Sequence, residues 1–352
     1  MMSNEDNLVL ESARRLFGGL ADPAWLHGSL AEWPAAKWRQ LSEQGLPLGL
    51  VREEDGGFGL SQVEMLSVIR LAGYHALPLP LGETMVAARL VAAAGGGLPE
   101  GPLSFASPAA TDGVISGGDG VLRTSGMARA IPWARHAERI LVALAHAGGT
   151  AIVALARGAF AVTPGATLAG EPCDTIRWDV EIDGVQARLI AGDIDLELAG
   201  AAIRTLAIAG AVERLLDMTT RYALDRQQFG RALTQFQAIQ QHLAILAGQA
   251  VVCRTAADSV AEALFTPTGG RAIAMAKARA SEAAGLAASI AHQVHGAIGF
   301  SDEHDLHLFS KRLWTWREEF GSEHWWNRLI GSEIAAEGAP DIWSWLTQRE
   351  TA

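Results

Sequence analysis

The sequence contains few cysteines, and this scarcity excludes several classes of protein. Only Cys173 and Cys253 occur among 352 residues, far below the density of a secreted domain that is stapled by disulfides. Neither cysteine lies in a CxxC pair or beside a histidine at the spacing of metal ligands. We therefore expect a reducing, cytoplasmic compartment and no metal site.

Long apolar runs are also lacking. The uncharged stretch at residues 140–156 is interrupted by His146 and by two glycines, whereas a membrane-spanning helix needs about 20 apolar residues. This stretch instead predicts two strands joined by a turn. Residues 1–10 are polar and partly acidic, unlike a signal peptide, which begins with basic residues and continues with an apolar segment. We expect neither a membrane span nor an export signal.

Positive charge is scarce relative to negative charge. The chain has 28 lysines and arginines against 39 aspartates and glutamates, a net charge of −11. Because nucleic-acid affinity depends on clustered cations that neutralise phosphates, this balance argues against a nucleic-acid partner. The composition, 49% hydrophobic and 19% charged residues, indicates a globular protein that buries enough apolar surface to fold. A length of 352 residues favours two or three domains.

The hydrophobic pattern changes twice along the chain. Apolar residues recur at helical spacing up to about residue 97, and short β-rich runs separated by Gly, Asp or Pro follow over 103–198. No proline occurs between residue 198 and Pro267, and from residue 199 onward Ala-rich periodicity predicts three long helices, at 199–224, 236–264 and 270–295. The order predicts an α+β fold with an N-terminal helical domain at 1–100, a middle β-sandwich or small barrel at 101–198, and a C-terminal helical bundle at 199–352.

Two short strings in the last part can bind an anionic ligand. The first, Arg226-Gln-Gln-Phe-Gly230, offers a forked cation to phosphate oxygens, and Gly230 is expected to end the preceding helix so that the arginine is exposed. The second, Gln293-Val-His-Gly-Ala-Ile-Gly-Phe300, places glycines after a long helix, where backbone amides can approach a ligand. Taken singly, each string is more often a solvated turn or a simple helix C-cap.

In this order the strings resemble the acyl-CoA dehydrogenase family, and the resemblance runs nearly from end to end. The N-terminal part is similar as well, with Trp38-Arg-Gln-Leu-Ser-Glu-Gln-Gly-Leu46, then Glu54-Asp-Gly-Gly-Phe-Gly-Leu-Ser61, then Glu64. The resemblance implies an N-terminal helical domain, a middle β-domain and a C-terminal four-helix bundle. It also implies FAD, bound between the middle and C-terminal domains and across a dimer interface.

The resemblance assigns cofactor contacts to particular residues. The Arg226 string and the Gln293 string would reach the pyrophosphate and adenine side of a FAD held by the neighbouring subunit. A guanidinium suits this role because it offers two parallel donors to phosphate oxygens. Ala297 replaces a usual glycine, a change that we expect to be tolerated. The residues assigned to the cofactor are Arg226, Gln228, Phe229, Gln293, Gly296, Ala297 and Ser322.

Two departures from the family pattern concern this chain's own flavin and the catalytic base. Residues 130–132 are Ala-Ile-Pro where the family usually has a Trp-Ile-Thr run near the flavin, and Trp133 in a strand would point to the opposite face. The family's reaction removes an α-proton from an acyl-CoA, which requires a carboxylate. An ungapped reading puts Phe320 at that position. Glu319 is one residue away, a shift that rotates a helical side chain by about 100°, and the family's other base position falls near Gly200.

These departures lead to one hypothesis and two alternatives. The hypothesis is the FAD-completing, base-lacking subunit of a heteromeric acyl-CoA dehydrogenase of lipid metabolism, which acts on an acyl-CoA thioester with a longer partner subunit. The first alternative is a homo-oligomer that uses a relocated base, Glu319. The second is a flavin-free structural or CoA-ester-binding relative. The resemblance further implies a dimer or tetramer, and electron-transfer flavoprotein as the electron acceptor.

Tryptophan and glutamate are both concentrated near the C-terminal end. The chain has 11 tryptophans, and ordinary packing between helices is the simplest role for those in this region, although a packed subunit contact is a sharper interpretation. The glutamates at 318, 319 and 323, which lie among arginines, are more typical of a surface ion-pair network than of a catalytic base. Six of the 11 tryptophans lie near the C-terminal end, namely Trp314, Trp316, Trp325, Trp326, Trp343 and Trp345.

Overall fold

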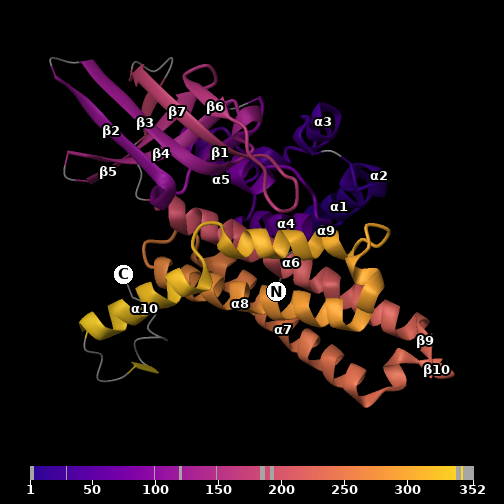
Figure 1. Cartoon of the computed structure of the whole chain (residues 1–352). Coiled ribbons are helices and arrows are strands. Elements are labelled where there is room, and N and C mark those ends of the chain that lie inside the picture. The colour runs from indigo at the N-terminus through magenta and orange to yellow at the C-terminus, as the bar shows by residue number, and fades with distance from the viewer. Residues whose placement is uncertain are drawn as a thin grey trace. The chain divides into compact units, whose positions relative to one another are not determined.

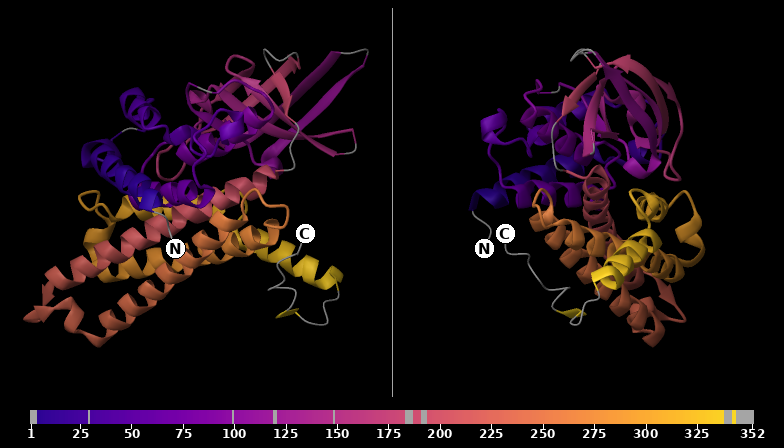
Figure 2. Two further views of the ribbon diagram at one scale, coloured as in Figure 1. Left: turned by 180° about the vertical axis from the view of Figure 1, so that it is seen from behind. Right: turned by 90° about the vertical axis from the view of Figure 1, so that its left-hand side faces the viewer.

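The computed structural model describes residues 4–28, 30–98, 100–118, 121–147, 149–182, 187–190, 194–337 and 342–343. The chain forms two compact units, one made of Met1–Ile69 and Leu77–Ile203 and the other of Arg70–Ala76 and Arg204–Ala352. Figure 1 labels the elements of both units, and Figure 2 shows them from two further sides. Trp345 lies outside the described residues.

The helices and strands follow the predicted order of helical, β and helical parts. The α-helices are α1 (Asn4–Leu20), α2 (Pro23–Leu26), α3 (Ala35–Glu43), α4 (Gln62–Tyr74), α5 (Leu81–Ala93), α6 (Leu196–Asp225), α7 (Gln237–Ala263), α8 (Gly270–His295), α9 (Leu306–Glu318) and α10 (Glu323–Glu337). The strands are β1 (Leu103–Phe105), β2 (Thr111–Gly118), β3 (Val121–Pro132), β4 (Arg139–His146), β5 (Gly149–Ala156), β6 (Phe160–Thr163), β7 (Cys173–Glu181), β8 (Ala187–Ile190), β9 (Gln227–Gln228) and β10 (Arg231–Ala232).

Two four-stranded sheets form the β-part of the first unit. One sheet has the order β1-β4-β5-β8, with β1 parallel to β4, and the other has the order β2-β3-β7-β6 and is antiparallel throughout. Side chains from both sheets, among them Ile140, Val153, Ile176 and Trp178, share one buried apolar cluster, as in a β-sandwich. The predicted middle β-region is confirmed, and the stretch at 140–156 forms β4 and β5 as expected.

The helical part of the first unit is built on large buried apolar side chains. Phe17 of α1, Leu41 of α3, Met65 of α4 and Met85 of α5 are all fully buried. Polar groups link this layer to the sheet, because the Thr84 hydroxyl accepts a hydrogen bond from the Leu103 amide at 3.0 Å. The N-terminal helical part is therefore confirmed, whereas the domain limits at residues 100 and 198 stay a prediction.

The second unit is a helical bundle. Helices α6, α7 and α8 correspond to the three predicted long helices, α9 and α10 pack against α8, and Figure 2 shows α7 and α8 running side by side. Alanines occupy most buried positions of α8, so neighbouring helices can approach closely. Where the end of α4 meets α6, a Cβ at Gly210 would stand 1.9 Å from the Arg70 carbonyl oxygen. This contact requires glycine.

One helix is apolar enough to raise the question of a membrane. Within the described part of the chain, α7 alone is long and apolar enough to cross a membrane by length and composition. Only 28% of its most apolar window is buried. A single such helix is weak evidence, because the helix of a soluble bundle passes the same test. The absence of a membrane span stays a prediction.

Two local predictions are wrong. The helix before the Arg226 string ends at Asp225, so Gly230 does not end it but lies in the turn between β9 and β10. Trp133 is not part of a strand, because β3 ends at Pro132 and Trp133 adopts a left-handed φ of 57° at the start of a 3-10 turn. The positive φ turns this indole into the interior, where it is buried.

Candidate functional site

The Arg226 string forms a short hairpin at the end of α6. Gln227 and Gln228 pair antiparallel with Ala232 and Arg231. The turn residues Phe229 and Gly230 both have positive φ, 52° and 76°, as a two-residue type I′ turn requires. Phenylalanine adopts this conformation only at a cost. The Phe229 side chain is 91% exposed, so the hairpin presents an apolar ring at its tip.

Arg226 is the first residue beyond α6. Its backbone amide donates to the Tyr222 carbonyl and its carbonyl accepts from the Leu233 amide, both at 2.9 Å, which fixes the base of the hairpin. The exposed guanidinium makes no hydrogen bond or ion pair with any residue in the described ranges. The Gln228 side chain is exposed beside it. The string therefore offers an uncommitted cation to a ligand.

The second string lies where α8 ends. After His295 the chain turns through Gly296, which has φ of 64° and ψ of −142°, into the 3-10 helix η6 (Gly296–Phe300). A Cβ at Gly296 would meet no atom within 4 Å, so the backbone faces open space. Gln293 and Ala297 are also exposed. The backbone of this turn is therefore exposed, and its role toward a ligand stays a prediction.

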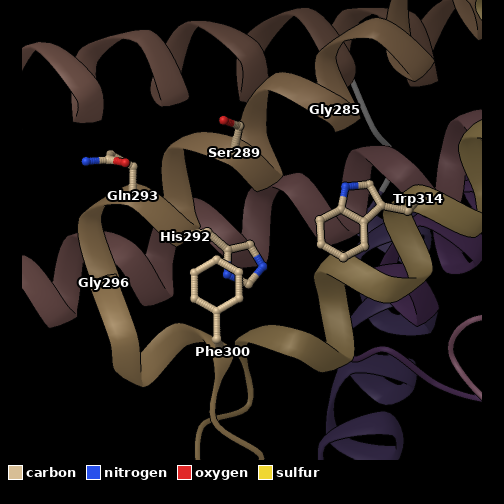
Figure 3. Close-up of a pocket in the computed structure, with 7 residues that line it drawn as sticks. All are labelled: Gly285, Ser289, His292, Gln293, Gly296, Phe300 and Trp314. Atoms are coloured by element: carbon tan, nitrogen blue, oxygen red, sulfur yellow. The ribbon is translucent and has the colours of Figure 1, made fainter.

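A pocket of about 420 Å³ lies beside this turn (Figure 3). The His292 imidazole of α8 stacks on Phe300 with ring centroids 4.4 Å apart and on Trp314 of α9 at 5.7 Å. Its Nε2 lies 2.9 Å from the Ser310 hydroxyl. Burial lowers the pKa of His292. The neutral form of the imidazole is therefore favoured in the aromatic wall of the pocket.

Tyr222 brings the two strings to one end of the bundle. It lies one helical turn before Arg226, and its hydroxyl donates to the His295 carbonyl at 3.2 Å. Its ring also stacks on the His295 imidazole with centroids 4.4 Å apart. Because Gly296 follows His295 directly, the structure places the Arg226 hairpin and the Gly296 turn next to each other, although they are far apart in sequence.

The predicted base position lies in the turn between α9 and α10. Phe320 is only 6% exposed and has φ of 52°. The adjacent Glu319 accepts a hydrogen bond from Nε of Arg204 at 2.5 Å, and these two side chains are 14% and 7% exposed. A carboxylate in a buried ion pair is a weak proton acceptor, because protonation would destroy the pair.

Lys277 holds the turn between α9 and α10 through hydrogen bonds. The side chain lies on α8 and is fully buried. Its ammonium donates to the carbonyls of Arg317 at 2.9 Å and Gly321 at 2.7 Å, which flank Glu319 and Phe320. Burial lowers the pKa of Lys277 to about 7, since desolvation disfavours the charged form. The turn is thus held by buried polar contacts that the sequence analysis missed.

Ser322 lies in the turn between α9 and α10 and not at the end of the bundle that carries Arg226. Its hydroxyl accepts a hydrogen bond from the Trp325 amide at 3.4 Å, at the start of α10. Lys277 of α8 contacts the turn between α9 and α10, whereas His295 at the end of α8 adjoins the Gly296 turn. The 18 residues of helix from Lys277 to His295 correspond to about 27 Å. The structure therefore brings together six of the seven residues assigned to the cofactor and separates Ser322, together with Glu319, from them.

The C-terminal tryptophans and glutamates only partly follow the predictions. Trp316 and Trp326 are buried, as expected for packing between helices, whereas Trp314 is 38% exposed at the pocket. Arg317 pairs with Glu323, with Nε 2.9 Å from the carboxylate, and this contact lowers the pKa of Glu323. The predicted ion-pair network therefore exists, but Glu319 pairs with the distant Arg204 instead.

The first unit contains a further buried carboxylate. Glu197, in the first turn of α6, is 5% exposed and accepts a hydrogen bond from the Ser107 hydroxyl at 2.5 Å. Glu197 lies close in sequence to Gly200, near which the family's other base position is predicted to fall. Across the described residues, no group of three His, Cys, Asp or Glu side chains could hold a metal ion.

Known proteins are similar to this chain in sequence and in fold. The family profile described as acyl-CoA dehydrogenase, C-terminal domain, matches residues 198–330. The chain is 29% identical over 322 residues to the acyl-CoA dehydrogenase IpdE2 of Mycobacterium tuberculosis, which covers 88% of this chain and 90% of that protein. A chain of the ChsE4-ChsE5 complex from Mycobacterium tuberculosis superposes with a TM-score of 0.84 at 24% identity, covering 97% and 99% of the two chains. A chain of the Tcur3481-Tcur3483 steroid ACAD G363A variant gives a TM-score of 0.85 at 22% identity, covering 96% and 99%.

These similarities agree with the architecture of the two units. A helical part, a β-sandwich and a helical bundle in this order define the fold of a class of oxidoreductases, the acyl-CoA dehydrogenases. The chain is similar to acyl-CoA dehydrogenases, through the family profile over its C-terminal part and through relatives over most of its length. The homologues of this family are FAD-dependent. The predicted resemblance and fold class are confirmed, and the roles assigned to single residues stay predictions.

Proposed function

We propose that this chain is the FAD-completing subunit of a heteromeric acyl-CoA dehydrogenase and that the catalytic base lies on a longer partner chain. One observation carries the proposal. Phe320, which the ungapped reading puts at the position of the family's carboxylate, is buried, and the neighbouring Glu319 accepts a hydrogen bond from Arg204. A homo-oligomer with Glu319 as its base would have to break this buried pair in every catalytic cycle, which is costly.

The Arg226 end of the bundle fits the diphosphate half of FAD. Arg226 presents an uncommitted guanidinium, and the Gly296 backbone faces open space that a larger residue would fill. Ala297 is exposed, so its methyl group does not obstruct the turn. Gln228, Phe229 and Gln293 would complete the contacts. The residues of this chain would bind and orient the diphosphate, and FAD, when bound, would supply the acceptor for the hydride that leaves the acyl-CoA thioester.

The partner we propose is a longer acyl-CoA dehydrogenase chain in a dimer or tetramer. Exposed apolar side chains lie on the bundle helices, among them Leu224 of α6, Ile245 and Val251 of α7, and Leu286 of α8, each at least 44% exposed. Apolar surface of this kind marks protein contacts. The solved neighbour described as the ChsE4-ChsE5 complex shares the fold. Electron-transfer flavoprotein would then be the electron acceptor.

Substitution of Arg226 tests the cofactor assignment. In the complex assembled with the partner, Arg226→Ala should raise the Kd for FAD about tenfold, because a hydrogen bond to a charged group contributes roughly 1.5–3 kcal/mol. The matched control is Arg254→Ala on α7, which removes an exposed arginine that lies 3.4 Å from Asp258. Equal FAD affinity in both variants would reject the assignment.

A further inference from the structure

Three aromatic side chains meet where the Arg226 hairpin and the Gly296 turn leave the bundle. The Tyr222 ring stacks on the His295 imidazole, with centroids 4.4 Å apart and planes inclined by 24°. His304, from the loop before α9, stands edge-on to both rings, 4.7 Å from His295 and 6.2 Å from Tyr222. We call these three residues the Tyr222 cluster.

Hydrogen bonds fix the orientations of the three side chains in the Tyr222 cluster. The Tyr222 hydroxyl donates to the His295 carbonyl at 3.2 Å, one of the last carbonyls of α8, which have no partner within the helix. His295 Nδ1 lies 2.8 Å from the Ala291 carbonyl and therefore carries the proton. His304 Nδ1 accepts from the Leu306 amide at 3.1 Å. Burial lowers the pKa of His295 to about 4, so this imidazole is neutral at physiological pH.

The cluster connects both strings through one tyrosine. The Tyr222 carbonyl accepts the Arg226 amide at 2.9 Å, at the base of the hairpin. The Tyr222 hydroxyl holds the carbonyl of His295, the residue directly before Gly296. The relative position of Arg226 and the Gly296 turn therefore depends on contacts at the two ends of a single residue.

Resting on the proposed function, we propose that the Tyr222 cluster is a positioning device for the diphosphate of FAD. It sets the spacing between the Arg226 guanidinium and the Gly296 backbone without touching the cofactor itself. Such spacing matters because charge-assisted hydrogen bonds to phosphate need a defined geometry, and small displacements of binding groups are costly. A cluster that served only packing would stabilise the bundle and leave FAD affinity unchanged.

The two tyrosines of the chain provide a matched pair of variants. Tyr222→Phe removes only the hydroxyl and keeps the stacked ring. Tyr74→Phe removes a hydroxyl that donates to Asp217 at 2.6 Å, on the same helix α6 but away from both strings. In the assembled complex, Tyr222→Phe should raise the Kd for FAD about fivefold, the effect of roughly one hydrogen bond, while Tyr74→Phe leaves the Kd unchanged. The unfolding temperature of the FAD-free protein should respond similarly to both substitutions.

A double-mutant cycle separates positioning from plain stability. In the Arg226→Ala background, Tyr222→Phe should have a smaller effect on the Kd for FAD than in the wild type, because the hydroxyl acts through the placement of that guanidinium. Full additivity, or an unchanged Kd in Tyr222→Phe alone, would overturn the inference. If Arg226→Ala itself leaves the Kd unchanged, the proposed function fails instead, so the two failures are distinguishable.

Discussion

In the turn between α9 and α10, the predicted position of the catalytic base carries Phe320, and the nearest carboxylate, Glu319, is one residue away. Phe320, at the position predicted for the family's carboxylate, is buried, and its ring has no group that accepts a proton. Glu319 points to Arg204, with Oε2 and Nε 2.5 Å apart. A base must be free to approach the substrate, and a buried carboxylate that already neutralises a buried guanidinium is not.

Glu319→Gln should therefore affect stability far more than catalysis. Breaking a buried pair by removing one charge typically lowers the free energy of unfolding by about 3 kcal/mol. Urea unfolding would measure this loss, and Glu318→Gln, at a 65% exposed side chain on the same turn, is the control. Turnover per folded, FAD-saturated complex should remain near that of the wild type. A large loss of turnover at full folding would restore Glu319 as the base.

Lys277 should make stability depend on pH. Its pKa falls from 10.5 to about 7 in the folded protein because of burial. Between these values the unfolded chain binds more protons than the native state, so the unfolding free energy contributed by this lysine rises with pH, by up to about 1.4 kcal/mol per pH unit. Urea unfolding between pH 7 and pH 10 should show this slope in the wild type.

Lys277→Met isolates the effect of the buried ammonium. The variant keeps an unbranched side chain of similar length but has no charge to desolvate, so its unfolding free energy minus that of the wild type should fall as the pH rises from about 7 to 10. Lys311→Met, on α9, controls for the loss of one positive charge. A constant difference between wild type and Lys277→Met across this pH range would contradict the account.

Some residues could be singled out from local sequence patterns, whereas others could not, because their contacts are with residues far away in the sequence. The sequence singles out Arg226 and Gly296 as candidates because each lies in a short string whose neighbouring residues belong to the same pattern. Arg204 was missed, since its partner Glu319 is 115 residues away and pairing at that distance leaves no local pattern. Lys277 was missed for a related reason, because a lone lysine in an Ala-rich helix looks like a solvated surface residue.

At the scale of elements, the β9–β10 hairpin carries an exposed aromatic residue at a turn position that disfavours it. A type I′ turn favours Asn at its first central position, yet the chain has Phe229 there with φ of 52°. Phe229→Asn should raise the unfolding free energy of the FAD-free protein by about 0.5–1 kcal/mol, since left-handed backbone costs an ordinary residue roughly 1–2 kcal/mol. The same variant should bind FAD more weakly, and FAD titration checks this. Unchanged FAD affinity would remove Phe229 from the site.

Helix α7 gives a second element-scale prediction, on assembly. Val251 is 66% exposed in a helix of high hydropathy, and we expect this side to face the partner subunit. Val251→Glu should abolish co-purification of the two chains, because a charge would be buried without a partner. Ser259→Glu, near the polar end of α7, should leave assembly intact. If Val251→Glu assembles normally, the contact lies elsewhere.

At the scale of the whole molecule, the sequence predicted the order of the parts well and their long-range contacts poorly. Periodicity identified α6, α7 and α8 within a few residues of their ends, since Ala-rich helices without proline give a strong local signal. The β-sandwich followed from short runs with turn residues. The meeting of Tyr222 with His295 and of Arg204 with Glu319 could not be predicted, because bundle packing aligns helix faces whose residues are far apart in sequence.

The most direct test of the central claim is the flavin content of the chain alone and in complex. The protein is expressed singly and together with a longer acyl-CoA dehydrogenase chain from the same genome, and bound FAD per chain is measured from the visible spectrum. The account predicts little or no FAD on the single chain, and in the complex stoichiometric FAD that bleaches on addition of acyl-CoA. Stoichiometric FAD with acyl-CoA-dependent bleaching on the single chain would contradict it.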